Sequence, residues 1–168
     1  MQLSLIDLSD RSPVKLYLAG PMRGYERHNF PMFDHVANEL RRQLKATVFN
    51  PADHDREIGF SEETEILPTH TLQQMMRWDL ARVMEVDAVV FLPGWRKSKG
   101  ACVERLVAHY LGLPCFDFVD TRGKDLSGDL DKRMARGQFD AYYADGFELV
   151  RQPEYAEPEP IEWRLQGA

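Results

Sequence analysis

The sequence is poor in cysteine, has no long apolar run and carries no excess of positive charge. Its two cysteines, Cys102 and Cys115, fall in apolar segments, and no basic, apolar leader precedes them, so we expect reduced thiols in a cytoplasmic protein. The apolar stretch at 88–93 is far too short to cross a bilayer, so no contact with a membrane is expected. The 168 residues include 21 basic and 27 acidic side chains, and this net charge of −6 argues against a nucleic-acid polymer as partner. A small anionic ligand held by a few local groups is compatible with it.

Motifs for the common cofactors and metals are also absent. Neither Gly-x-Gly-x-x-Gly nor a Walker-type phosphate loop follows the first predicted strand, and we expect no cofactor. Asp53, His54, Asp55 and His70 are metal-ligand residue types, but their spacing matches no standard site, so we expect no metal.

The chain does contain an alternation of apolar strands and amphipathic helices. Strand-forming residues occupy 14–18, 47–50, 87–92 and 114–118, with 147–150 as a possible fifth strand. Apolar side chains at helical spacing predict helices over 30–44, 68–85 and 101–111. This order predicts an α/β fold with a doubly wound, flavodoxin- or Rossmann-like sheet, mostly parallel, of four to five strands in three α/β/α layers.

The remaining segments predict one domain with a tail. Residues 1–150 form the domain, in which 52–67 is interpreted as an acidic loop or lid and a short helix is expected near 129–136. Residues 151–168 are rich in proline and glutamate and are expected to be extended or disordered.

Glu104 and Asp79 are the two carboxyl groups most suited to chemistry. Glu104 falls in the first turn of the predicted helix after a buried strand, where backbone N–H groups stabilise negative charge. That position also suits a glutamate that only stabilises the helix start. Asp79 lies on the apolar stripe of its helix, so burial raises its pKa and suits it to donate a proton, unless the helix end tilts it into water or an arginine pairs with it.

Two polar turns follow predicted parallel strands and therefore belong at one sheet edge, where ligands bind in this fold class. The first turn has a glycine that allows close backbone approach, and its arginine is either an anion clamp or a surface charge. The second leads into a helix N-terminus and is either a phosphate cradle or a solvated loop. The candidate binding residues in and beside these turns are Gly20, Met22, Arg23, Gly24, Trp95, Ser98 and Gly100.

Four segments together resemble the nucleoside 2-deoxyribosyltransferase superfamily. They are 17–21 (Tyr-Leu-Ala-Gly-Pro), 79–80 (Asp-Leu), 87–90 (Asp-Ala-Val-Val) and 98–104 (Ser-Lys-Gly-Ala-Cys-Val-Glu). The resemblance covers about residues 14–118 and is closest to small phage and bacterial members and to the nucleotide N-glycosidases.

The resemblance implies a role for each matched residue. Glu104 corresponds to the nucleophile, Asp79 to the group that handles the proton at the base, and Tyr17 to the residue that orients the nucleophile. Ser98 stands where the transferases that act on free nucleosides have an aspartate. The glycosidases have serine there and an Arg-Gly like Arg23-Gly24, both used on the 5′-phosphate. Two departures are Pro21, which removes a backbone donor, and the lack of a glycine after the nucleophile.

The resemblance therefore implies hydrolysis of the base–sugar bond of a (deoxy)nucleoside 5′-monophosphate through a glutamyl-glycosyl intermediate. Trp95 and Met22 would contact the base. Alternatives are a nucleoside 2-deoxyribosyltransferase and a nucleotide-binding or sensing module without efficient catalysis. The resemblance also implies a homo-oligomer.

Overall fold

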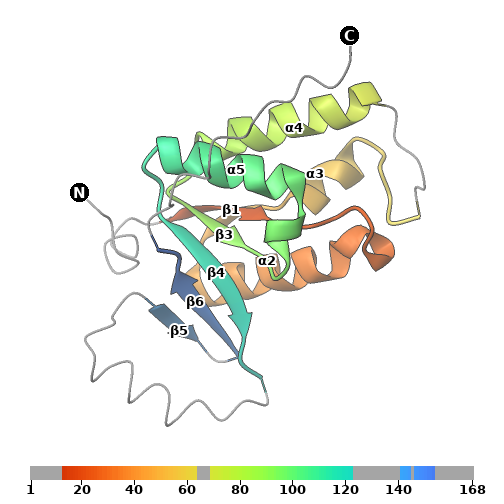
Figure 1. Ribbon diagram of the computed structural model, residues 1–168. Helices are drawn as coiled ribbons and strands as arrows, with labels where there is room; N and C mark the ends of the chain where they lie inside the picture. Colours follow the sequence, from red (N-terminus) through yellow and green to blue (C-terminus); the bar gives the residue numbers. More distant parts are fainter. Residues whose placement is uncertain (1–12, 64–68, 123–140, 145, 154–168) are drawn as a thin grey trace.

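The computed structural model describes residues 13–63, 69–122, 141–144 and 146–153, and a six-stranded sheet forms its centre (Figure 1). Its strands are β1 (Lys15–Ala19), β2 (Thr47–Phe49), β3 (Ala88–Phe91), β4 (Cys115–Asp120), β5 (Ala141–Ala144) and β6 (Phe147–Arg151). They are arranged in the order β2-β1-β3-β4-β6-β5; the first four are parallel, while β6 and β5 are antiparallel to their neighbours. The α/β fold class and the mostly parallel sheet are confirmed. The strand that the sequence analysis does not predict is β5.

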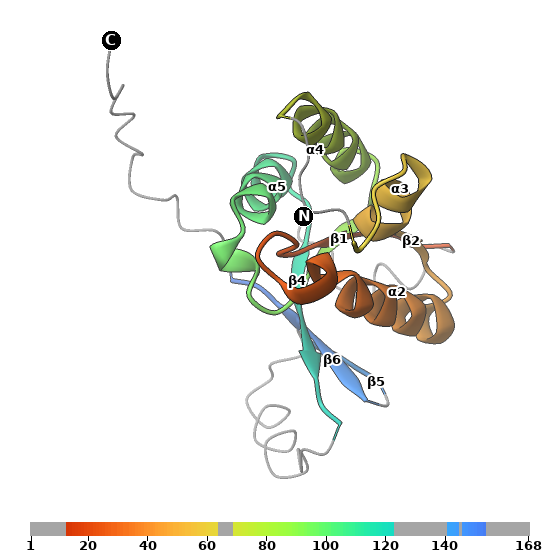
Figure 2. The ribbon, with the colours of Figure 1, turned by 90° about the vertical axis from the view of Figure 1, so that its right-hand side faces the viewer.

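Helices cover both faces of the sheet (Figure 2). They are α2 (Phe30–Leu44), α3 (Pro51–Glu57), α4 (Thr69–Val83) and α5 (Lys99–Tyr110), with 3₁₀ turns η1 (Glu26–Asn29) and η2 (Trp95–Lys97). Helix α2 lies on one face, and α4 and α5 lie on the other, which gives the expected three layers. Among the described residues, no helix has the length and apolar character needed to cross a membrane.

Alternation along β1 explains how this strand serves both layers. Leu16 and Leu18 belong to the apolar cluster that includes the buried face of α2. Tyr17 belongs to the cluster on the opposite face, with residues of α4 and α5. Because successive side chains of a strand point to opposite faces, the sequence places Tyr17 on the side of α4 and α5.

The segment predicted as an acidic loop over 52–67 in fact begins with helix α3. Pro51 occupies its first turn, and the Asn50 side chain accepts a hydrogen bond from the Ala52 N–H at 3.0 Å, which caps the helix. The prediction of a loop there is wrong because it gave weight to the acidic composition and not to the capping residue. Residues 64–68 of this segment and the short helix expected near 129–136 lie outside the described residues.

The turns after β1 and β3 touch at the carboxyl edge of the sheet. A Cβ atom added to Gly20 would lie 2.9 Å from the Cβ of Leu92, so only glycine lets the two turns approach this closely. These two turns therefore hold their side chains in a fixed relation, as a binding site at this edge requires.

The C-terminal end of β6 is tied to α5. The Arg105 side chain donates to the Gln152 Oε1 at 2.6 Å and to the Pro153 carbonyl at 3.3 Å. The rest of the expected tail, residues 154–168, lies outside the described residues. Cys102 and Cys115 are both free thiols.

Replacing Leu18 by alanine tests the central position of β1. Leu18 is fully buried between the sheet and α2, so we expect the free energy of unfolding to fall by about 2–5 kcal/mol in urea denaturation. Tyr110→Ala is the control, because Tyr110 is 72% exposed, and it should change the stability by less than about 0.5 kcal/mol. Equal losses in the two variants would contradict this description of the core.

Candidate functional site

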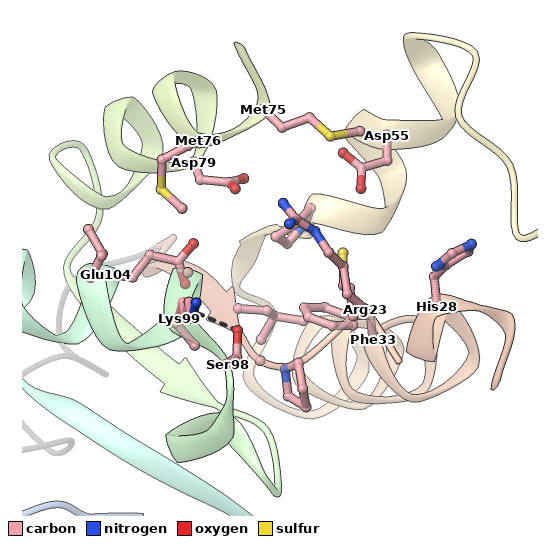
Figure 3. Close-up of a pocket in the computed structure, with 18 of the residues that line it drawn as sticks. Arg23, His28, Phe33, Asp55, Met75, Met76, Asp79, Ser98, Lys99 and Glu104 are labelled. Carbon is pink, nitrogen blue, oxygen red and sulfur yellow. Dashed lines mark hydrogen bonds between the residues drawn. The ribbon is translucent and has the colours of Figure 1, made fainter. Parts of the chain in front are cut away.

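A cavity of about 650 Å³ opens at the carboxyl ends of β1 and β3, a size typical of small-molecule sites (Figure 3). Its walls come from the turn after β1, from α3 and α4, and from the start of α5. Eight of the residues singled out in the sequence line it: Tyr17, Gly20, Met22, Arg23, Asp79, Ser98, Gly100 and Glu104.

A buried hydrogen bond joins two of these residues. The Tyr17 hydroxyl donates to Glu104 Oε1 at 2.8 Å, and it bridges 87 positions of the chain. Tyr17 is fully buried and Glu104 is only 5% exposed. The bond fixes the Glu104 side chain at the cavity wall and stabilises its ionised form.

The position of Glu104 in α5 differs from the prediction. The helix begins at Lys99 and not near residue 101, which puts Glu104 in the second turn. Backbone N–H groups there are already bonded within the helix, so they cannot stabilise the carboxylate. The donor that replaces them is the Tyr17 hydroxyl.

Asp79 reaches the same cavity from α4, and the two carboxyl groups affect each other. Burial raises the pKa of Asp79 to about 7; the Tyr17 hydroxyl opposes this shift, and the charge of Asp55 adds to it. Burial, followed by the charge of Asp79, also raises the pKa of Glu104. Because ionisation of one makes ionisation of the other harder, the pair loses its two protons in separate steps.

The start of α5 also lines the cavity and brings positive charge to it. Ser98 caps the helix, since its Oγ accepts from the Ala101 N–H at 3.2 Å. By helix geometry, the N–H groups of the next two residues, Lys99 and Gly100, have no acceptor within α5. Lys97, Lys99 and Arg23 also line the cavity. Two uncommitted N–H groups and three cations suit a phosphate.

Trp95 and Gly24 do not line the cavity. The Trp95 indole N–H donates to Asp117 Oδ1 at 3.0 Å, and its ring packs against Phe91 with centroids 4.6 Å apart. The indole is thus held in the core beside β3 and β4, so the contact with a base expected of Trp95 is not available in this arrangement. Gly24 has φ of +79° and shapes the turn that carries Arg23.

Sequence reasoning missed Asp55 as a site residue. It lies in α3, lines the cavity and is only 4% exposed. Burial raises its pKa to about 7, and the neighbouring charge of Arg56 partly opposes this shift. The sequence feature that could have revealed Asp55 is the helix start at Asn50-Pro51. A helix that begins there places Asp55 on the same buried face as Pro51 and Ala52.

The other metal-ligand types near Asp55 point elsewhere. The His54 ring stacks on Trp78 with centroids 4.0 Å apart, and Asp53 accepts a hydrogen bond from Arg41 at 2.9 Å. In the part of the chain that the structure describes, no group of three His, Cys, Asp or Glu residues could hold a metal ion.

Comparisons with known proteins place the chain in a family whose function is not described. No curated protein matches it. Among solved structures it is similar to a 2-deoxyribosyltransferase from Bacillus psychrosaccharolyticus, at 22% identity and a TM-score of 0.47, over 62% of this chain and 71% of that one. The model of a family described as a domain of unknown function, DUF4406, matches residues 14–117, and the chain belongs to that family.

Proposed function

We propose that the protein is an N-glycosidase that hydrolyses the base–sugar bond of a (deoxy)nucleoside 5′-monophosphate. The observation that supports this most is the buried Tyr17–Glu104 hydrogen bond beside Asp79 in one cavity. A carboxylate held for attack and a carboxyl group that keeps its proton near neutral pH are the two groups that a retaining glycosidase needs.

The proposed reaction has two steps. A Glu104 oxygen attacks C1′ of the sugar while the bond from C1′ to the base nitrogen breaks, and its electron pair leaves with the base. Asp79 gives its proton to the base, which departs neutral, and the sugar remains as an ester of Glu104. Water then attacks C1′ and gives a proton to Asp79, and the ester bond breaks to restore the Glu104 carboxylate. The products are the free base and the sugar 5-phosphate.

The positive charge in the cavity lining supports a monophosphate rather than a free nucleoside. Ser98 has a hydroxyl that can donate to a phosphate, whereas an aspartate at this position would repel it. Arg23 also lines the cavity, and among the described residues no acidic side chain forms an ion pair with it. Binding the phosphate there would leave C1′ free to approach Glu104.

Replacing Glu104 by glutamine tests the nucleophile. Glutamine keeps an acceptor for Tyr17, so the fold should persist, but its amide cannot form the ester. We expect the rate at which free base is released from nucleoside monophosphates to fall by at least about 10³-fold. Chromatography of the reaction mixture measures this rate.

Glu85→Gln is the matched control, because Glu85 follows α4 and its side chain is about half exposed. It should retain full activity, and both variants should unfold near the temperature of the unmodified protein. Undiminished base release by Glu104→Gln would exclude the mechanism. If the unmodified protein is stabilised by nucleotides but releases no base, it is a binding module.

Because Asp79 must be protonated to act as the acid, the rate of base release should depend on pH. Its pKa is raised to about 7, so the acid form is present below that pH and is lost as the pH rises through it. Base release should therefore decline above about pH 7, and Asp79→Asn should lower the rate and abolish this decline. A rate for the unmodified protein that stays constant up to pH 9 would contradict the assignment.

Arg23→Ala tests the phosphate side. Loss of a charged hydrogen bond to phosphate should raise KM for a nucleoside monophosphate by roughly ten- to hundredfold, with little effect on the slower hydrolysis of the nucleoside. Arg96→Ala is the control, because Arg96 lies over the Trp95 ring and does not line the cavity. If Arg23→Ala impairs hydrolysis of the nucleotide and of the nucleoside equally, Arg23 does not bind the phosphate.

A further inference from the structure

Asp55 is a buried carboxyl group that lines the cavity and has no hydrogen-bond partner among the residues that the structure describes. Its side chain is only 4% exposed, and within the described residues no donor or cation binds it. The charged side chains next to it in α3 are paired with other residues. Asp53 is paired with Arg41, and Arg56 donates to Asp34 at 2.9 Å. Because Asp55 lines the cavity and has no hydrogen-bond partner among the described residues, a ligand bound there can supply one.

The cavity places Asp55 at the end where a base would lie. Figure 3 shows Glu104 and Asp55 apart, with Asp79 between them, and Lys99 and Ser98 on the Glu104 side of the view. If C1′ lies at Glu104 and the phosphate at the start of α5, the base extends past Asp79 toward Asp55. This step rests on the proposed function.

The cavity also has apolar lining residues, and one of them lies over Asp55. Phe33, Phe60, Leu72 and Met75 contribute to its lining, and Met75 reaches over Asp55 in Figure 3. Apolar side chains pack well against the faces of a flat ring, and hydrogen bonds then form at the edge of the ring. Asp55 is therefore placed to contact the edge of the base.

We propose that Asp55 selects the base, and that it favours bases with an exocyclic amino group over their oxo counterparts. An ionised carboxylate offers only acceptors, so it binds an amino group and repels the lone pairs of a carbonyl oxygen. Although burial disfavours its charge, an amino group from the base supplies the donor that the ionised form lacks. Cytosine is thus preferred to uracil, and adenine to hypoxanthine.

Matched nucleotide pairs test this selection. For the unmodified protein, kcat/KM should be at least about tenfold higher for cytidine than for uridine monophosphate, and for adenosine than for inosine monophosphate. Asp55→Asn should bring both ratios close to one, because an amide presents a donor as well as an acceptor. Asp55→Ala, which removes both, should also abolish the preference.

Asp53→Asn is the matched control on the same helix, since Asp53 does not line the cavity, and it should keep both ratios. Ratios that Asp55→Asn leaves unchanged, or a preference of the unmodified protein for the oxo bases, would overturn the proposal.

Thermal stabilisation by the same four nucleotides separates this inference from the proposed reaction. If no base is released but amino bases stabilise the unmodified protein more than Asp55→Asn, the hydrolase proposal fails and the selection by Asp55 stands. If none of the four nucleotides binds, both proposals fail.

Discussion

The site depends on the hydrogen bond from the Tyr17 hydroxyl to Glu104. It joins the first strand to the helix after the third, across the interface of sheet and helix layers. A buried carboxylate without a donor would be strongly destabilising, so this bond allows Glu104 to occupy the cavity wall. Because Tyr17 is enclosed in the core, the donor cannot move away, and the carboxylate stays in one position.

Three carboxyl groups, from Asp55, Asp79 and Glu104, share one cavity, and burial raises the pKa of each. Repulsion between them favours partial protonation near neutral pH. The structure thus brings together an acid and a potential nucleophile without a metal-binding cluster among the described residues. It also leaves a third group, Asp55, for which the described residues supply no hydrogen-bond partner.

The cavity holds acidic and basic side chains that come from different elements. Its carboxyl groups come from α3, α4 and the second turn of α5, whereas its cations come from the turn after β1 and from the residues around the start of α5. A ligand that carries an anion at one end and hydrogen-bond donors at the other fits this arrangement. A nucleoside monophosphate with an amino base has that form, and the two proposals are linked for this reason.

Local sequence patterns were enough to predict the parallel strands, the helix layers and eight of the residues that line the cavity. Alternation in β1 and the apolar run of β3 are local patterns, and parallel strands bring their following turns to one edge. The sequence analysis did not predict α3, because the segment is rich in acidic residues and only two residues, Asn50 and Pro51, mark the helix start. For the same reason it did not identify Asp55 as a residue of the site. The family resemblance implied that Tyr17 orients Glu104, but the contact of Trp95 with Asp117 in the core became visible only in the folded structure. The reason is physical: a buried donor bonds to whichever acceptor packing brings within reach, and positions far apart along the chain do not show this locally.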